Sequence, residues 1–296
     1  MTDQVVLSLF PGVDLFGRGF EAEGFCVVRG PDLIYGSDIR GFSAPAGRFD
    51  GVIGGPPCVG YSALRRVPDD GYSDAMVLEF LRVVREARPA WFVMENVPRV
   101  PSVGVDGYVV QRFDLSGADC GMRQRRLRHF QFGSLLGAPL AVLRDWPAGD
   151  PAPSGVVAAV TASEGRRSGR RGFAEFCQLM GLAGALELPG FSKEASYRAV
   201  GNGVPLPMGR VVARSVKAWC DCPAAAGGLC VCGCGRVVAG RARCAGVACR
   251  KRLERSRRGV VTVRGRLQLG SCDLAGVTGP GAVTIARSQR DEPALV

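Results

Sequence analysis

Residues 49–58 have the sequence FDGVIGGPPC, in which a short apolar run meets a turn. The run predicts a strand over Phe49–Ile53, and two glycines followed by two prolines end it. The prolines fix the backbone just before Cys58, so its thiol should stand at a strand end with little local freedom. The same order, a short apolar strand followed by an unusual residue, recurs along the first 219 residues.

Strand-like and helix-like stretches alternate through this part of the chain. Further strands are predicted at Val5–Leu9, Phe25–Val28, Trp91–Met94 and Leu127–Phe132. Helices are predicted at Gly19–Glu23, at Asp74–Ala87 with Asp74 as N-cap, at Phe173–Gly181, and at Met208–Trp219 after a loop that starts at Ser196. Short apolar strands separated by helices indicate an α/β fold, a parallel sheet with helices on both faces.

Four unusual residues follow successive strands of this predicted sheet: Gly12, Asp38, Cys58 and Glu95. Ligands of such sheets bind beyond the carboxyl ends of the strands, so we expect these residues to line one crevice. A thiol there is a nucleophile if its pKa is lowered, and a buried carboxyl is a general acid if its pKa is raised. Taken singly, each residue has a plainer interpretation: a lone Cys is more often a small buried apolar residue, and a Glu at a strand end is usually solvated.

Composition and charge divide the chain unevenly. The chain has 296 residues, 47% of them hydrophobic and 22% charged, which suits one large domain or one domain with a small module. No apolar run approaches the roughly 18 residues of a membrane helix, and the N-terminal residues lack the pattern of a signal peptide, so we expect a cytoplasmic protein. Of the net charge of +11, residues 220–258 carry +7, from nine basic and two acidic residues. Such a cluster is typical of a surface that binds a polyanion.

Six short motifs, in this order, resemble those of the DNA cytosine-5 methyltransferase family. They are residues 10–16 (FPGVDLF), 36–39 (GSDI), 55–58 (GPPC), 95–97 (ENV), the pattern Gln124-x-Arg126-x-Arg128, and residues 201–205 (GNGVP). Each motif is weak alone, but six in family order over residues 4–219 are specific. The resemblance implies a Rossmann-like sheet that uses S-adenosylmethionine and methylates carbon 5 of a cytosine flipped out of the DNA duplex.

The resemblance also assigns roles to residues of this chain. It implies catalytic roles for Cys58, Glu95, Arg126 and Arg128, with Cys58 attacking carbon 6 and Glu95 contacting ring nitrogen 3. It implies cofactor contacts from Phe10, Gly12, Asp32, Asp38, Pro56, Asn202 and Val204, and a nucleic-acid contact from Gln124. Three departures stand out: Val59 follows the catalytic Cys where the family commonly has Gln, Arg123 replaces a Pro, and the glycine loop carries Ser8, Pro11 and Asp14.

The region between the Arg motif and the last motif is short. Family members place a substantial target-recognition region there, and this chain has a reduced one at 133–172. We therefore doubt that this region alone reads a base sequence. The compact form is compatible with a phage or bacterial enzyme of the restriction–modification type, and we expect a monomer.

Residues 220–258 form a predicted second module rich in Cys. Seven of the 12 Cys residues lie between Cys220 and Cys249, and in a chain without a secretion signal such a cluster favours metal over disulfides. The segment resembles small bacterial zinc-finger modules, which implies structural zinc on Cys232, Cys234, Cys244 and Cys249, with Cys230 as a substitute ligand and Cys220 and Cys222 as a rival pair. A basic helix predicted at Cys249–Arg258 would contact nucleic acid through Arg250, Lys251, Arg252 and Arg255. Residues 259–296 are predicted to be a weakly structured tail.

Two other functions remain open at this point. Related enzymes apply the same chemistry to RNA, and a catalytically weak protein could use this fold as a nucleic-acid-binding scaffold. Because a scaffold has no need of Cys58, Glu95, Arg126 and Arg128 together, the sequence favours the enzyme.

Overall fold

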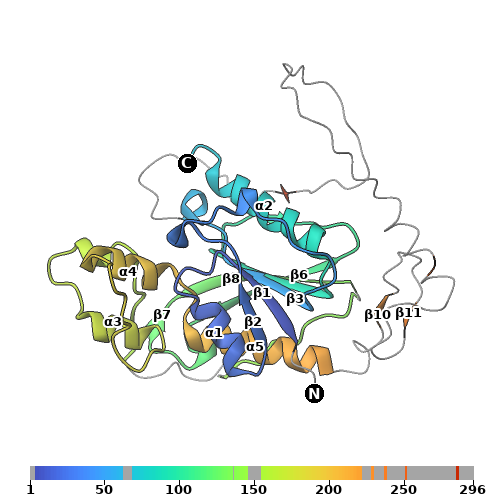
Figure 1. Ribbon diagram of the computed structural model, residues 1–296. Helices are drawn as coiled ribbons and strands as arrows, with labels where there is room; N and C mark the ends of the chain where they lie inside the picture. Colours follow the sequence, from blue (N-terminus) through green and yellow to red (C-terminus); the bar gives the residue numbers. More distant parts are fainter. Residues whose placement is uncertain are drawn as a thin grey trace, which may run out of the picture.

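The computed structural model describes residues 4–62, 69–135, 137–145 and 155–221, with the short segments 228–229, 237–238, 251 and 285–286 (Figure 1). A single six-stranded sheet forms the centre of the described part. Its strands, in spatial order, are β2 (Cys26–Arg29), β1 (Val5–Leu9), β3 (Gly51–Gly54), β4 (Trp91–Asn96), β8 (Leu127–Ser134) and β6 (Val109–Ser116).

The direction of the strands differs in part from the predicted parallel sheet. Strands β2, β1, β3 and β4 are parallel neighbours, as expected, but β8 runs antiparallel to both β4 and β6. The sheet is therefore mixed. Strand β6 was missed because most of its residues are only half-buried or exposed, so it lacks a continuous apolar run. Only a short connection, with the 3-10 turn η4 (Ala118–Cys120), separates β6 from β8, and so short a link joins neighbouring strands in antiparallel fashion.

Helices cover both faces of the sheet, as predicted (Figure 1). Helices α1 (Leu15–Ala22) and α5 (Leu206–Asp221) pack together on one face. They approach so closely that a Cβ added to Gly19 would lie 2.7 Å from the carbonyl carbon of Gly209. Helix α2 (Tyr72–Ala87) covers the other face with Phe80 and Leu81, which are fully buried against β3 and β4.

Three helix predictions need correction. The helix predicted at Gly19–Glu23 is α1, which begins four residues earlier, at Leu15, and ends at Ala22. Helix α2 begins at Tyr72 after Gly71, which has a φ of 77°, so Asp74 lies in the first turn and accepts a hydrogen bond from the Tyr61 hydroxyl instead of capping the helix. The residues after Ser196 belong to helix α4 (Lys193–Asn202) and not to a loop. Ser192 caps α4 by accepting from the Ala195 N–H, and the closely spaced Gly and Asn residues at its end had concealed the helix.

The remaining elements are short. Helix α3 (Phe173–Leu179) packs against α4, as does the 3-10 turn η5 (Glu164–Arg166). The other 3-10 turns are η1 (Leu33–Tyr35), η2 (Ile39–Gly41) and η3 (Val59–Tyr61). Three two-stranded pairs join β7 (Gln124–Arg125) to β9 (Val157–Ala158), β5 (Ser102–Val103) to β12 (Ile285–Ala286), and β10 (Gly228–Leu229) to β11 (Val237–Val238).

The described residues of 133–172 are tied to the main body. Leu140 is buried, and its main chain exchanges hydrogen bonds with the Gln111 amide on β6. The Leu143 N–H donates to Ser215 Oγ and the Ala138 carbonyl accepts from Trp219, both on α5. Residues 137–145 thus pack against β6 and α5. In the described part of the chain, no helix is long and apolar enough to cross a membrane.

Candidate active site

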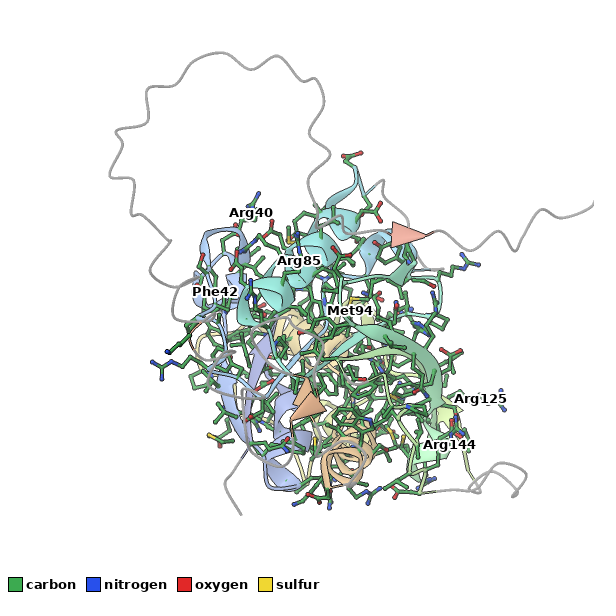
Figure 2. All side chains as sticks on the ribbon, turned by 90° about the vertical axis from the view of Figure 1, so that its right-hand side faces the viewer. Arg40, Phe42, Arg85, Met94, Arg125 and Arg144 are labelled. Carbon is green, nitrogen blue, oxygen red and sulfur yellow. The ribbon has the colours of Figure 1, made fainter. Side chains whose placement is uncertain are left out.

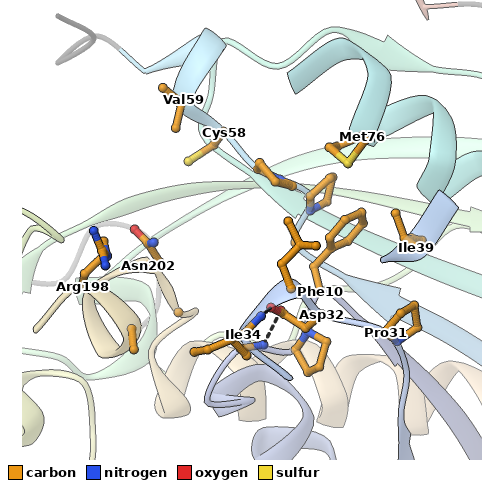
Figure 3. Close-up of a pocket in the computed structure, with 18 of the residues that line it drawn as sticks. Phe10, Pro31, Asp32, Ile34, Ile39, Cys58, Val59, Met76, Arg198 and Asn202 are labelled. Carbon is orange, nitrogen blue, oxygen red and sulfur yellow. Dashed lines mark hydrogen bonds between the residues drawn. The ribbon is translucent and has the colours of Figure 1, made fainter. Parts of the chain in front are cut away.

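A cavity of about 390 Å³ opens at the carboxyl ends of β1, β3 and β4 (Figure 3). Its size falls in the range of small-molecule sites. One wall comes from the turns after β1 and β2, a second from the turn after β3, and a third from α4. Six of the seven predicted cofactor residues line it, together with three of the four predicted catalytic residues: Phe10, Gly12, Asp32, Asp38, Pro56 and Asn202, and Cys58, Glu95 and Arg128.

The turn after β1 has an unusual backbone. Phe10 and Gly12 have positive φ values of 53° and 54°, a conformation that a side chain disfavours and glycine tolerates. The Asp32 carboxylate holds this turn, because it accepts from the Gly12 N–H at 2.8 Å and from the Ile34 N–H at 2.9 Å. The Tyr35 hydroxyl adds a hydrogen bond to the Gly12 carbonyl at 2.6 Å. The sequence motif at 10–16 is therefore held against η1 by an acid from the next strand end.

The second acid of this wall, Asp38, is paired with a neighbour. Its carboxylate accepts from the Arg40 side chain and from the Arg40 N–H. These bonds lower the pKa of Asp38 to about 2, so it is ionised at neutral pH. Both acids on the β2 side thus line the cavity in positions that are fixed by local hydrogen bonds.

An acid, a thiol and a guanidinium meet at the other end of the cavity. The Arg128 Nε lies 2.9 Å from the Glu95 Oε1, and only 7% of Glu95 is exposed. Burial raises the pKa of the Glu95 carboxyl, and the nearby Arg128 opposes that shift. Burial also raises the pKa of the Cys58 thiol; the Glu95 charge adds to this effect and the Arg128 charge reduces it. At rest Cys58 is therefore a thiol, and its ionisation depends on the charges of these two neighbours.

A buried amide holds the turn that carries the thiol. The Asn96 Nδ2 donates to the Pro56 carbonyl at 3.1 Å, and Asn96 is 1% exposed. Close by, Gly55 leaves room for the acid, because a Cβ there would lie 2.9 Å from Glu95 Oε2. Strand β4 thus supplies the acid with one residue and fixes the Cys58 turn with the next.

Comparison with known proteins identifies this arrangement. A family model described as C-5 cytosine-specific DNA methylase matches residues 34–142, which include Cys58, Glu95 and Arg128. Residues 34–142 are therefore similar to C-5 cytosine-specific DNA methylases.

Individual relatives agree with this assignment. The chain is 28% identical over 181 residues to the Type II methyltransferase M.XorII of Xanthomonas oryzae pv. oryzae, covering 47% of this chain and 42% of that protein. It is 39% identical over 111 residues to the Type II methyltransferase M.AquIA of Picosynechococcus, covering 30% and 45% of the two chains. The chain thus spans less than half the length of these curated relatives.

Solved structures share the fold. A methyltransferase of Entamoeba histolytica, EhMeth, superposes with a TM-score of 0.55 at 11% identity, covering 74% of this chain and 99% of the other. A putative DNA modification methyltransferase of an Escherichia coli prophage gives a TM-score of 0.53 at 16% identity, covering 73% and 99%. At these identities, the likeness concerns the α/β fold.

Two residues of the Gln-x-Arg-x-Arg motif of this family do not reach the cavity. Gln124 is 1% exposed, its Nε2 bonds the Leu179 carbonyl, and its Oε1 accepts from the Val160 N–H. The predicted nucleic-acid contact of Gln124 is therefore wrong for this structure, because both ends of the amide are used inside the protein. Its exposed neighbour Arg125 points outward, whereas Met94 on β4 lies inside the molecule (Figure 2).

Arg126 is a buried clamp and not part of the cavity wall. Its Nη1 donates to the Val160 carbonyl and its Nη2 to the Gly201 and Gly203 carbonyls, each at 2.9 Å. It is 2% exposed, and burial lowers its pKa to about 9, so it keeps its charge at neutral pH. These contacts correct the prediction that Arg126 touches the substrate: both terminal nitrogens of the guanidinium donate to main-chain carbonyls, two of which lie at the α4 end.

The wall formed by α4 also differs from prediction. Val204 is 4% exposed and packs in the core, so it does not line the cavity, whereas Asn202 and Gly203 do. Residues that the sequence did not single out also line the cavity: Ile34, Met76, Phe191, Arg198 and Ala199. Only helical spacing within 193–202 could have indicated Arg198, since it lies one turn before Asn202.

The predicted metal ligands and most of the predicted basic helix lie outside the described residues. Cys230, Cys232, Cys234, Cys244 and Cys249 belong to that part, as do Arg250, Arg252 and Arg255. Lys251 is described as helical and exposed. Among the described residues, no group of three or more metal-binding side chains occurs.

Proposed function

We propose that this chain transfers a methyl group from S-adenosylmethionine to carbon 5 of cytosine in DNA. The observation that carries the proposal is the meeting of the Cys58 thiol with the Glu95–Arg128 pair, 2.9 Å apart, in one cavity at the carboxyl ends of parallel strands. The names of the relatives, Type II methyltransferases among them, support the same activity.

The cavity has the chemistry that S-adenosylmethionine requires. Phe10, Ile34 and Ile39 offer apolar surface for a flat base, and Asp32 and Asp38 offer carboxylates for hydroxyl and amino groups. Pro56 and Asn202 complete the walls near the thiol. When bound, the cofactor supplies the methyl group.

The reaction begins with the charges around the thiol. The Cys58 thiolate attacks carbon 6, which forms a sulfur–carbon bond and breaks the double bond between carbons 5 and 6. Protonated Glu95 donates to ring nitrogen 3 and so draws the displaced electrons toward the ring nitrogen and carbonyl, while Arg128 holds the carbonyl oxygen. Because ionised Glu95 raises the pKa of Cys58, a protonated Glu95 also makes the thiolate easier to form.

The later steps restore the ring. Carbon 5 would take the methyl group, leaving S-adenosylhomocysteine, and would then lose its proton to a base. The sulfur–carbon bond would break to release the Cys58 thiolate. The product is 5-methylcytosine. In this scheme Arg126 and Asn96 act only by positioning, Arg126 through the end of α4 and Asn96 through the Pro56 carbonyl.

We further propose that residues 220–258 form a zinc-binding module that supplies DNA affinity, with residues 259–296 as a tail. The concentration of basic residues there and the shortness of 133–172 support this division. Zinc content of the purified full chain, measured by mass spectrometry, should be about one ion per chain. It should fall to background in a Cys232→Ser, Cys244→Ser double variant. Removing 220–296 should weaken DNA binding and flatten its salt dependence; unchanged affinity and slope would contradict the role.

The central experiment measures transfer of labelled methyl groups to duplex DNA and, in parallel, to transfer RNA. We expect incorporation into DNA and none in Cys58→Ala, with cofactor binding by that variant intact. Labelling of transfer RNA alone would replace DNA by RNA as the substrate. Labelling of DNA by the Cys58→Ala variant would refute the nucleophile, and absence of transfer to both would refute the proposal. Bisulfite sequencing of DNA from an expressing host would then give the target site.

A further inference from the structure

One cation on the cavity wall has no counter-charge. Arg198 lines the cavity from α4, beside Asn202 and across from the β3 turn that carries Cys58 (Figure 3). Its side chain is exposed, and in the described part of the chain it has neither an acidic nor a carbonyl partner. The acid one helical turn earlier, Glu194, is instead paired with Arg166 of η5.

Each acid in the cavity wall is already occupied. Asp32 accepts two main-chain N–H groups, Asp38 is paired with Arg40, and Glu95 is paired with Arg128. None of these carboxylates therefore neutralises Arg198. A guanidinium left unpaired at the edge of a cavity offers planar donors that match the oxygens of a carboxylate or a phosphate.

We infer that Arg198 binds an anionic oxygen group of a ligand in this cavity, and so positions that ligand. The inference rests on the proposed function, which brings two such groups here: the carboxylate of the cofactor's amino-acid end and a backbone phosphate beside the flipped cytosine. Both are bound by the same chemistry. The clamp of Arg126 on the carbonyls of Gly201 and Gly203 fixes the helix end from which Arg198 projects, so the backbone that carries Arg198 is held in place before the ligand arrives.

The experiment compares Arg198→Gln with the wild-type chain in two binding measurements. Calorimetry would use S-adenosylhomocysteine, which keeps the carboxylate, and 5′-methylthioadenosine, which lacks it. Fluorescence anisotropy would use labelled duplex DNA over a range of salt concentrations. Arg167→Gln is the matched control, because Arg167 is also exposed and directly follows η5, which packs against α4, but it does not line the cavity.

If the anion is the carboxylate, Arg198→Gln should weaken S-adenosylhomocysteine binding by about tenfold or more and leave 5′-methylthioadenosine unchanged. If it is the phosphate, cofactor binding should stay unchanged, DNA binding should weaken, and the salt slope should fall by about one unit. Arg198→Lys should recover part of either loss, since it keeps the charge without the planar fork.

Two results would overturn the inference alone: no change in either measurement, or an equal change in Arg167→Gln, which would mark a general effect of charge. A wild-type chain that binds neither S-adenosylhomocysteine nor DNA would overturn the proposed function itself, and this inference with it. Because the wild-type measurements come first, the two failures are distinguishable.

Discussion

Replacing Arg126 by Met tests whether this residue positions the site or takes part in chemistry. The guanidinium donates to three buried carbonyls, those of Val160, Gly201 and Gly203. A hydrogen bond from a charged group contributes about 1.5–3 kcal/mol, so three lost bonds set an upper bound of about 9 kcal/mol. The burial of the cation, which lowers the pKa of Arg126 to about 9, offsets part of this. We therefore expect a loss of about 3–5 kcal/mol in the free energy of unfolding.

The assay is equilibrium unfolding in urea, followed by tryptophan fluorescence, to which the buried Trp91 and Trp219 contribute. Arg125→Met is the control, because Arg125 is the adjacent residue and is exposed; it should change stability by less than about 0.5 kcal/mol. S-adenosylhomocysteine binding by Arg126→Met should also weaken, since Asn202 and Gly203 line the cavity at the clamped helix end. A variant with unchanged stability and cofactor affinity that has lost only its turnover would refute the clamp and restore a catalytic role.

Three further predictions concern the reacting groups. Alkylation of Cys58 by iodoacetamide, mapped by mass spectrometry, should have a pH midpoint above that of free cysteine, because burial raises the pKa of this thiol. Arg128→Gln should raise the midpoint further, because it removes a positive charge that favours the thiolate. A midpoint below that of free cysteine would contradict the assignment. Gly55→Ala should lower kcat by about 10- to 100-fold with little loss of stability, because the added Cβ would lie 2.9 Å from Glu95 Oε2 and displace the acid. A kcat equal to that of the wild type would show that Glu95 has room to move. Asp32→Asn should weaken S-adenosylhomocysteine binding by about tenfold, measured by calorimetry, because an amide has only one oxygen to accept the N–H groups of Gly12 and Ile34; binding equal to that of the wild type would mean that the turn holds its shape without Asp32.

Much of the sheet was predictable because its strands are short apolar runs with clear ends. The predicted strand at Val5–Leu9 is confirmed over the same residues. The strand predicted at Trp91–Met94 is also confirmed, and it continues two residues further, to Asn96. The edge strand β6 was not predictable in this way, because an edge strand with one solvated face carries polar residues such as Gln111 and Arg112. The antiparallel direction of β8 was not predictable either, because β8 follows β6, the strand that the sequence did not indicate.

The sequence by itself determined which reactive residue follows which strand, because Gly12, Cys58 and Glu95 each come directly after an apolar run. The two-residue alternation of an extended segment also places Gln124 and Arg126 on one side and Arg125 on the other. Only the tertiary structure decided what the buried members of the alternation contact. Arg126 and Arg128 differ by two residues, yet one meets the carbonyls of the α4 end and the other meets Glu95 in the cavity. The partners of a buried charge are set by segments that fold back from far along the chain, and local spacing carries no information about where those segments come to rest.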